Sequence, residues 1–552
     1  MNKPWLFSAL KRENLINNVD NSDFDVLIFG GGITGAGIAL DAASRGLKVV
    51  LVEQNDFASG TSSRSTKLVH GGLRYLEKLQ FKFVADLGRE RKILHDNATH
   101  NVTPTPVILP IIKGGQLNRT LTFMALLLYD RLAGVKKEYR AKWITKNLLL
   151  KKYPYLKSEG LKGAFIYNEY KTKDGRLVIE TLKKAVEYGA IALNYIQVSE
   201  LLFRQGKVYG AKVNDSITDT GFTISSKHVI NATGPWSERF MKTYDSAMEK
   251  SLFLTKGIHI VIDKQRFPLK EAFYFDTYDK RMVFAIPRQN FVYVGTTDTP
   301  YHNSLRHPDI SNSEMEYLLK VVNLKFSGLQ LSITDVVSCW AGIRPLIKSK
   351  GKNPGEISRK EELFISPAGL ITITGGKLTG YRLMAKQVVD KIVRNTTGKF
   401  IKCFTEKIRL SGSNWKNPPA LHQLVEIADN KFDEAKQTGI SAIEFKKLFY
   451  RYGTNIDIIT EKAYEYLSLL KNHELIWLKA ELWYAVNFEM VTNLSDFCAY
   501  RTEMVLFETD RLKKHINFIA DCLCGFLDWT PEEKQRQINL FIEHWNEYKI
   551  LT

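Results

Sequence analysis

DVLIFGGGITG, residues 25–35, is the stretch that decides the fold of this chain. An apolar run leads into a glycine turn, and an alanine-rich helical pattern follows over 36–45. A second apolar run, 48–52, ends at Glu53. A strand, a glycine turn, a helix and a strand that ends in an acid form the fingerprint of a domain that binds an adenine dinucleotide.

Each glycine of the turn has a separate role in this fingerprint. Gly30 permits the tight turn, Gly32 lets the backbone approach a pyrophosphate, and Gly35 lets helix and strand pack closely. The free N–H groups at the start of the helix then face the diphosphate. Glu53 is placed to accept both ribose hydroxyls, and its charge disfavours the 2′-phosphate of NADP.

A second polar stretch, GTSSRSTKLVHGGLRYL over 60–76, follows Glu53. Small hydroxyl residues and glycines allow backbone and Oγ groups to line a long cofactor at close range. A flexible linker is the alternative interpretation, and the apolar residues at 68–69 and within 71–76 argue against it.

Composition restricts the class of protein. A length of 552 residues predicts two or three domains. The net charge of +19 suits an anionic substrate, an anionic membrane surface or nucleic acid, although a lysine-rich proteome also explains it. The five cysteines are scattered and odd in number, which predicts no disulfide framework, no metal site and a reducing cytosol.

The rest of the chain alternates between strand-rich and helical patterns. A strand is expected over 192–198. HVINATGPW over 228–236 and ITITGGKLTGYR over 371–382 are strands that end in small-residue turns, and 250–335 is rich in strands. Beyond about 400 the pattern becomes helical. The longest apolar run, 121–129, is too short to span a bilayer, so membrane association would be peripheral.

The motifs together resemble one enzyme family. In order they are GGGITG (30–35), HGGLRYL (70–76), NATGPW (231–236), GTTD (295–298), AGIRPL (341–346) and GGKLT (375–379). This set closely resembles the FAD-dependent (aerobic) glycerol-3-phosphate dehydrogenases, which belong to the D-amino-acid-oxidase-like flavoproteins. Gly380 departs from the family, which commonly has a second Thr there.

The resemblance implies a fold, a reaction and partners. The fold would be α/β, with a glutathione-reductase-type, Rossmann-like FAD-binding domain, a mixed-sheet substrate domain and a C-terminal all-helical domain. The reaction would oxidise sn-glycerol 3-phosphate to dihydroxyacetone phosphate with FAD, and a membrane quinone would accept the electrons. The expected division is 20–80, 160–235 and 336–395 for the FAD-binding domain, 81–159 and 236–335 for the substrate or cap domain, and 400–552 for the helical domain.

The resemblance also implies the residues of the site. Arginine suits phosphate because its guanidinium meets two oxygens at once, and the family pattern brings Arg74, Arg344 and Arg359 near the substrate, with Tyr75 as a hydroxyl donor. His259 lies within an apolar strand pattern, where a core histidine is the usual interpretation, and the family match favours a substrate-facing general base. Lys377 is expected at the flavin edge. Whether His259 takes the proton, or Arg344 or Lys377 tunes the hydroxyl's acidity, stays open.

The residues expected to contact FAD come from all of the glycine and hydroxyl segments. They are Gly30, Gly32, Ile33, Thr34, Gly35, Glu53, Thr61, Ser62, Ser63, Lys67, Leu68, His70, Gly71, Val198, Ala232, Thr233, Gly234, Gly376, Lys377, Leu378 and Thr379.

Three alternatives compete with this interpretation: a glycerol-3-phosphate oxidase that uses oxygen, an amino-acid or amine oxidase, and a basic FAD-containing RNA-binding protein. The last lacks a basic stripe interleaved with aromatics, so no nucleic-acid partner is expected. We expect a cytoplasmic protein at the periphery of the membrane, with a homodimer among the open options. Its candidate membrane contacts are 5–7 beside Lys11 and Arg12, and the run 121–128 near Lys113, Arg119 and Arg131, for which a buried core helix is the alternative.

Overall fold

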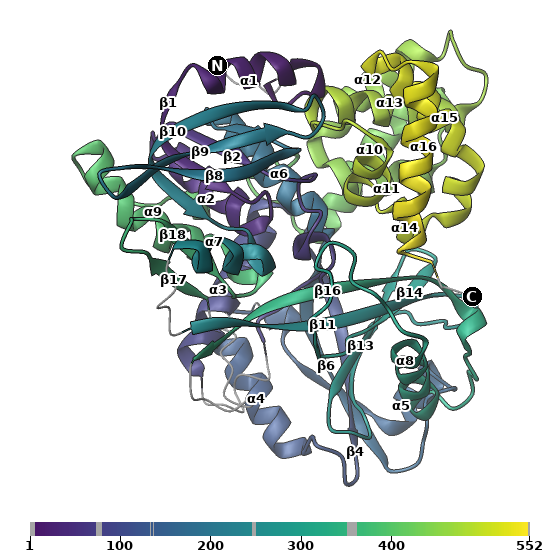
Figure 1. Ribbon diagram of the computed structural model, residues 1–552. Coiled ribbons are helices and arrows are strands. Elements are labelled where there is room, and N and C mark those ends of the chain that lie inside the picture. The colour runs from purple at the N-terminus through teal and green to yellow at the C-terminus, as the bar shows by residue number, and fades with distance from the viewer. Residues whose placement is uncertain are drawn as a thin grey trace.

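The computed structural model describes residues 6–72, 80–132, 134–135, 137–244, 250–349 and 361–549. Figure 1 shows three parts: a sheet with helices at upper left, a second sheet below it, and a group of yellow and green helices at upper right. The predicted fold class, an α/β flavoprotein fold with a C-terminal helical domain, is confirmed.

The first sheet contains the predicted glycine fingerprint. Its central strands run parallel, and the β8–β9 hairpin extends β10 on the antiparallel side. The strands in spatial order are β17 (Glu362–Ile365), β18 (Ile371–Thr374), β10 (Thr220–Asn231), β1 (Asp23–Phe29), β2 (Val49–Val52) and β7 (Ile191–Leu193), with β8 (Ile196–Arg204) and β9 (Lys207–Asp215) beside β10.

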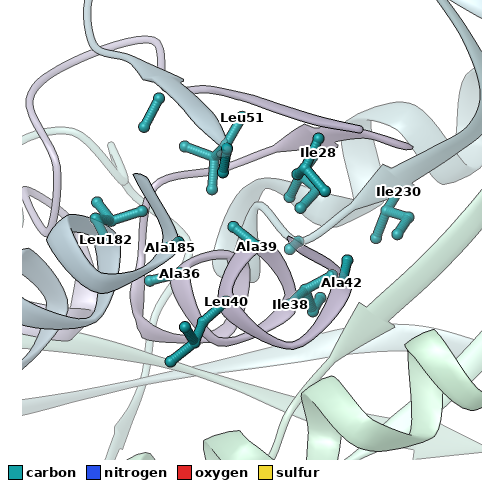
Figure 2. Close-up of a cluster of buried hydrophobic side chains, with 14 of the residues drawn as sticks. Ile28, Ala36, Ile38, Ala39, Leu40, Ala42, Leu51, Leu182, Ala185 and Ile230 are labelled. Carbon is teal, nitrogen blue, oxygen red and sulfur yellow. The ribbon is translucent and has the colours of Figure 1, made fainter. Parts of the chain in front are cut away.

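Three helices cover the parallel strands: α2 (Ile33–Ser44), α6 (Asp174–Glu187) and α9 (Tyr381–Thr397). Parallel strands buried on both faces are apolar throughout, and the side chains of β1 from Val26 to Ile28 are fully buried. Figure 2 shows Ala39 of α2 toward Ile28 and Leu51 of the strands, and Ala36 beside Ala185 of α6. The alanines of the predicted helix therefore let α2 lie close to the sheet.

The second sheet is mostly antiparallel. Its longest pair joins β11 (Lys250–Asp263) to β16 (Val336–Ser349). The remaining strands, in spatial order from β11, are β14 (Phe291–Gly295), β13 (Met282–Arg288), β12 (Ala272–Asp276), β4 (Thr103–Ile112), β6 (Leu161–Lys171) and β3 (Leu68–Val69), with β15 (Thr299–Pro300) beside β11 and β5 (Lys142–Thr145) beside β6.

The other helices lie around the sheets or form the C-terminal part. Around the sheets are α1 (Arg12–Asp20), α3 (Phe81–Asn97), α4 (Arg119–Leu132), α5 (Lys146–Lys152), α7 (Ser237–Tyr244) and α8 (Asn312–Lys325). The C-terminal part comprises α10 (Leu421–Ala435), α11 (Ala442–Tyr452), α12 (Ile456–Tyr466), α13 (His473–Phe488), α14 (Met504–Phe507), α15 (Thr509–Leu527) and α16 (Pro531–Asn546). In the described part of the chain, no helix is both long enough and apolar enough to cross a bilayer.

The C-terminal helices share a hydrophobic core with the second sheet. Tyr293 and Trp340 of the sheet belong to the same buried cluster as Leu478 and Phe507 of the helices. The rings of Trp340 and Phe507 meet edge to face, with 6.2 Å between their centroids. Burial of this apolar surface fixes the helical part against the sheet.

Two sequence-based expectations differ from the observed strands. The strand expected over 192–198 is interrupted between β7 and β8, because Tyr195 has a positive φ of 59° and the Asn194 amide turns to Asp56. In addition, β6 and β16, which the expected division assigns to the FAD-binding domain, pair within the second sheet. We propose domain boundaries that follow the sheets, with 161–171 and 336–349 in the substrate domain.

Arg45, at the end of α2, forms buried ion pairs that join α2 to α9 beside the first sheet. Its guanidinium is buried, with Nε 2.9 Å from Asp41 Oδ1 and Nη1 2.6 Å from Asp390 Oδ1 on α9. Because Arg45→Met leaves the buried Asp41 carboxylate without its partner, we expect the free energy of unfolding to fall by about 3–5 kcal/mol. Urea unfolding of the FAD-loaded protein measures this. The exposed Arg394→Met on α9 is the control, and equal unfolding midpoints for the two variants would contradict the prediction.

Candidate active site

A cavity of about 210 Å³ lies at the carboxyl ends of the parallel strands of the first sheet. It is lined by the residues that end β1, β2 and β10, including Gly30, Glu53 and Ala232. In open α/β sheets, ligands bind at this edge, where the strand order reverses to either side of the first strand.

The glycine turn shapes the floor of this cavity. Gly30 has φ of 105°, and a Cβ there would lie 2.6 Å from the carbonyl oxygen of Ala232. A Cβ on Gly32 would lie 3.0 Å from Ser62 Oγ, which accepts a hydrogen bond from the Ile33 N–H at the start of α2. The backbone is thus bare where α2 begins, which fits the diphosphate of a dinucleotide.

Glu53 is held in place by the backbone around it. Its Oε2 accepts a hydrogen bond of 2.7 Å from the Gly31 N–H, and its Oε1 accepts one of 3.0 Å from the Asn55 N–H. Burial raises the pKa of Glu53, although these hydrogen bonds oppose the shift. The carboxylate lines the cavity at the end of β2, where a ribose would be expected.

The cavity brings together most of the residues predicted to contact FAD. The glycine turn and the hydroxyl stretch form one side, and the turns after β10 and β18 form the other. The predicted residues that line it are Gly30, Gly32, Ile33, Thr34, Glu53, Thr61, Ser62, Val198, Ala232, Thr233, Gly234, Gly376, Lys377 and Leu378.

Other predicted FAD contacts lie outside the lining of this cavity. Lys67 is fully buried, with Nζ 2.8 Å from Asp174 Oδ1 and 2.8 Å from Glu503 Oε1. Thr379 Oγ1 donates a hydrogen bond of 3.1 Å to the carbonyl of His70, which ties two of the predicted motifs together.

Four further predicted contacts stay predictions. Gly35 packs against the glycine turn, and the carbonyl oxygen of Ser63 accepts a hydrogen bond from Lys67. Leu68 belongs to β3, and the Gly71 N–H donates to the Tyr129 hydroxyl.

His259 lies on β11 directly opposite Trp340 of β16. The two rings stack with 4.5 Å between centroids, and His259 Nε2 lies 3.1 Å from Thr66 Oγ1. Burial, Arg344 and Lys67 together hold the pKa of His259 well below its usual range. The imidazole is therefore neutral at physiological pH, and its buried Nδ1 has no hydrogen-bond partner among the described residues.

Arg344 lies four residues along β16 from Trp340, and its guanidinium turns toward the 296–298 turn. Its Nη1 is 3.0 Å from Asp298 Oδ1, and its Nη2 donates a hydrogen bond of 2.9 Å to Thr296 Oγ1. A Cβ on Gly257 would lie 2.2 Å from Arg344 Nη2. Glycine at 257 therefore leaves room for this guanidinium.

The remaining predicted site residues divide into two groups. Arg74, Tyr75 and Arg359 lie outside the described residues. Lys377 lies at the N-terminal cap of a short helical turn, Leu378–Gly380, and lines the dinucleotide cavity.

Sequence reasoning missed several neighbours of these groups. Trp340 and Thr66 contact His259; Thr66 lies within the hydroxyl stretch, and Trp340 directly precedes AGIRPL. Trp236 ends the NATGPW motif and lines the cavity against Gly60. The motif itself was the signal for Trp236, whereas the contacts of Trp340 and Thr66 with His259 depend on tertiary packing of segments that are far apart in the chain.

Comparisons with known proteins agree with this geometry. Residues 25–384 match the family model of FAD-dependent oxidoreductases, and residues 403–534 match that of the C-terminal domain of alpha-glycerophosphate oxidase. The aerobic glycerol-3-phosphate dehydrogenase of Bacillus subtilis is 43% identical over 96% of both chains.

Solved structures show the same similarity. The glycerol-3-phosphate dehydrogenase from Bacillus halodurans, complexed with FAD, has a TM-score of 0.84 and 38% identity, and the match covers 98% of each chain. The L-alpha-glycerophosphate oxidase from Mycoplasma pneumoniae has a TM-score of 0.55 and 17% identity over 69% of this chain and 97% of its own, which is a likeness of fold alone. The chain therefore belongs to the FAD-dependent aerobic glycerol-3-phosphate dehydrogenases.

Proposed function

We propose that this enzyme oxidises sn-glycerol 3-phosphate to dihydroxyacetone phosphate and delivers the electrons to a membrane quinone. The observation that carries the proposal is the position of two side chains on the paired strands β11 and β16. His259 is a buried, neutral histidine, and Arg344 is a partly exposed arginine close enough to lower its pKa. The relatives that share nearly the whole chain are named for glycerol 3-phosphate, which supports the choice of substrate.

The first sheet holds the cofactor in this proposal. The bare backbone of Gly30 and Gly32 and the N-terminus of α2 hold the diphosphate of FAD, and Glu53 holds the ribose. Bound FAD supplies the hydride acceptor. Lys377 lines the same cavity, and its ammonium favours the negative charge that the cofactor gains on reduction.

The second sheet holds the substrate. Arg344 keeps 29% of its side chain exposed while Asp298 and Thr296 orient it, so its guanidinium is available to a phosphate or hydroxyl oxygen. His259 can accept the hydroxyl proton because its lowered pKa keeps the imidazole neutral. The stacked Trp340 and the Thr66 hydroxyl fix the direction of the ring.

Docking of the enzyme on a membrane would follow from α4. One face of this helix packs inward through Leu126 and Tyr129, whereas the other is apolar and exposed. Leu121 is 63% and Leu127 is 50% exposed, and Phe123, Met124 and Leu128 are exposed beside them. This exposure favours membrane contact over the alternative of a buried core helix. Basic residues flank the helix and suit anionic lipid headgroups.

Two residues of the other candidate membrane contact, at the N-terminus, are buried in the fold. Phe7 is buried against Phe57, with 5.4 Å between ring centroids. Arg12 is also buried, with Nη1 2.7 Å from Asp215 Oδ2. Because both side chains serve the fold of the first sheet, we propose α4 alone as the docking surface.

An oxygen-using glycerol-3-phosphate oxidase is the second candidate. Its support is the family model for the C-terminal domain, which is named for such an oxidase. The nearly full-length relatives named dehydrogenases favour the quinone. Hydrogen peroxide formed in stoichiometric amounts by the purified enzyme would favour the oxidase instead.

Arg344→Ala tests the substrate site. We expect the variant to retain FAD and to lose roughly 30-fold or more in kcat/KM for sn-glycerol 3-phosphate, because loss of a charged hydrogen bond costs about 2–5 kcal/mol. Dye-coupled kinetics measure this loss. Arg266→Ala, which removes an exposed ion pair with Asp335, is the matched control. Unchanged kinetics in Arg344→Ala would remove Arg344 from the site.

Gly32→Val tests the cofactor cradle. The added side chain would meet Ser62 and occupy the space proposed for the diphosphate, so we expect the purified variant to contain little or no FAD. Flavin absorbance relative to protein measures occupancy. Gly221→Val at the start of β10 meets only ordinary contacts and should keep its flavin. A yellow Gly32→Val enzyme with full occupancy would show that the dinucleotide binds elsewhere.

Flotation with liposomes tests the docking surface. We expect the wild type to float with anionic liposomes at low salt and less at high salt, since each well-placed Lys or Arg contributes about 1 kcal/mol. The double variant Leu121→Glu, Leu127→Glu should stay soluble. Leu469→Glu, at an exposed leucine of the helical part, should float normally. A wild type that does not float would contradict membrane docking and favour oxygen as acceptor.

A further inference from the structure

A second cavity, of about 1040 Å³, lies between the end of the second sheet and the C-terminal helices. One wall is formed by residues that end β6 and β13, and the other by residues of α11, α13 and α15. In Figure 1 the short helix α14 lies next to β14 on this side of the molecule. The cavity shares no lining residue with the dinucleotide cavity, so it is a separate space.

The sheet wall of this cavity carries three cations in one short region. Lys171 ends β6 and is exposed into the cavity, Lys173 follows two residues later, and Arg288 ends β13. The guanidinium of Arg288 donates a hydrogen bond of 3.3 Å to the Thr172 carbonyl, between the two lysines. All three positive charges therefore lie around one stretch of backbone.

These cations have few negative partners. Among the described residues, no carboxylate lies within ion-pair distance of Lys171 or of Lys173, whose Nζ instead donates a hydrogen bond of 2.6 Å to the Tyr450 carbonyl. Arg288 is paired with Glu503, and Glu503 also bonds the buried ammonium of Lys67. Because Asp174 also pairs with Lys67, Asp174 and Glu503 together balance Lys67 and Arg288. Glu503 acts on Lys173 only from beyond ion-pair distance, so neither lysine has a direct carboxylate partner among the described residues.

The acids on the helical wall do not supply the missing charge. Glu508 is engaged by Arg451 at 3.1 Å and by Arg511 at 3.0 Å. Glu474 is engaged by Lys514 at 2.9 Å and again by Arg511 at 3.3 Å. The two further acids of this wall, Glu444 and Asp510, have Lys447 and Lys513 at 3.6 and 3.7 Å. The cavity lining on the sheet side contains three cations and no carboxylate, so the sheet wall keeps an excess of positive charge.

This arrangement of charges lowers the pKa of both lysines. Although the Lys171 side chain is open to the cavity, the surrounding protein atoms reduce its hydration. This desolvation and the neighbouring charges of Arg288 and Lys264 lower the pKa of Lys171. Burial, Arg288 and Arg451 lower the pKa of Lys173 well below its usual range. An anion in the cavity would relieve both effects, since an opposite charge stabilises the protonated amine.

We propose that this cavity is a binding site for a small anion that carries a phosphate group, with Lys171 and Lys173 holding the phosphate. Two ammonium groups match a phosphate dianion. The volume exceeds what a free phosphate ion fills, and Phe291 and Ile443 line the cavity, which leaves apolar surface for an organic remainder. The site is independent of the proposed substrate site.

Affinity labelling with pyridoxal 5′-phosphate tests this proposal on the FAD-loaded enzyme. The aldehyde condenses with a lysine amine to an imine with loss of water, and added cyanoborohydride reduces that imine to a stable amine. We expect peptide mapping to find Lys171 or Lys173 labelled at least several-fold faster than Lys162, an exposed lysine on the same strand. Inorganic phosphate should slow this labelling, and an equal concentration of sn-glycerol 3-phosphate shows whether an organic phosphate protects better than the free ion.

A second aldehyde separates phosphate recognition from the mere reactivity of amines with a low pKa. Pyridoxal carries the same aldehyde without the phosphate and should show no preference for Lys171 or Lys173 over Lys162. The same preference for Lys171 or Lys173 over Lys162 with both aldehydes, or labelling with pyridoxal 5′-phosphate no faster than at Lys162, would overturn the proposal.

Two variants give an independent check. In Lys171→Ala, we expect inorganic phosphate to lose most of its protection of Lys173, whereas Lys162→Ala should keep that protection. Retained flavin absorbance shows that each variant is folded. Full protection of Lys173 in Lys171→Ala would contradict a site built from both lysines.

Discussion

The contact between the start of α2 and the end of β1 is the constraint on which the rest of the structure depends. A Cβ on Gly35 would lie 1.9 Å from the carbonyl oxygen of Gly30, so only glycine allows the helix to approach the strand this closely. This approach directs the first N–H groups of α2 into the cavity at the sheet edge. It also brings the Gly31 N–H within 2.7 Å of Glu53, which fixes the carboxylate at the end of β2.

Buried ion pairs then carry this geometry to the other parts of the protein. Lys67, within the hydroxyl stretch, joins Asp174 of α6 to Glu503 near α14. Arg501 in the helical part is paired with Asp56, which directly follows the β2 turn. Breaking such a pair leaves a buried charge uncompensated. The helical part is therefore held to the cofactor cavity by charges as well as by apolar packing.

The same network relates the large second cavity to the proposed substrate site. Glu503 contacts both Lys67 and Arg288, and Lys67 lies over the ring of Trp340, with 5.3 Å from its Nζ to the ring centroid. Trp340 in turn stacks on His259. A short chain of direct contacts through Glu503, Lys67 and Trp340 thus connects the cationic wall of the large cavity to His259 of the proposed substrate site.

The features that the sequence predicts correctly are those encoded in short, contiguous motifs. The glycine fingerprint, Glu53 and the turns at 231–234 and 375–379 are contiguous motifs, and the structure gathers most of their residues in one cavity. The expected division places β16 in the FAD-binding domain, whereas β16 pairs with β11 in the second sheet. No local pattern predicts this pairing, because it joins residues that are far apart in the chain. The ion pairs of Lys67 and the outward face of α4 likewise depend on tertiary packing, which no short motif encodes.

The central claim is that one site holds FAD and oxidises the phosphorylated alcohol. The most direct measurement mixes the FAD-loaded enzyme with sn-glycerol 3-phosphate in the absence of oxygen and of any other electron acceptor, and follows flavin absorbance. The account predicts that the yellow absorbance is lost with sn-glycerol 3-phosphate and persists with the same concentration of glycerol. Absorbance that persists with both compounds, or that is lost equally with both, would contradict it.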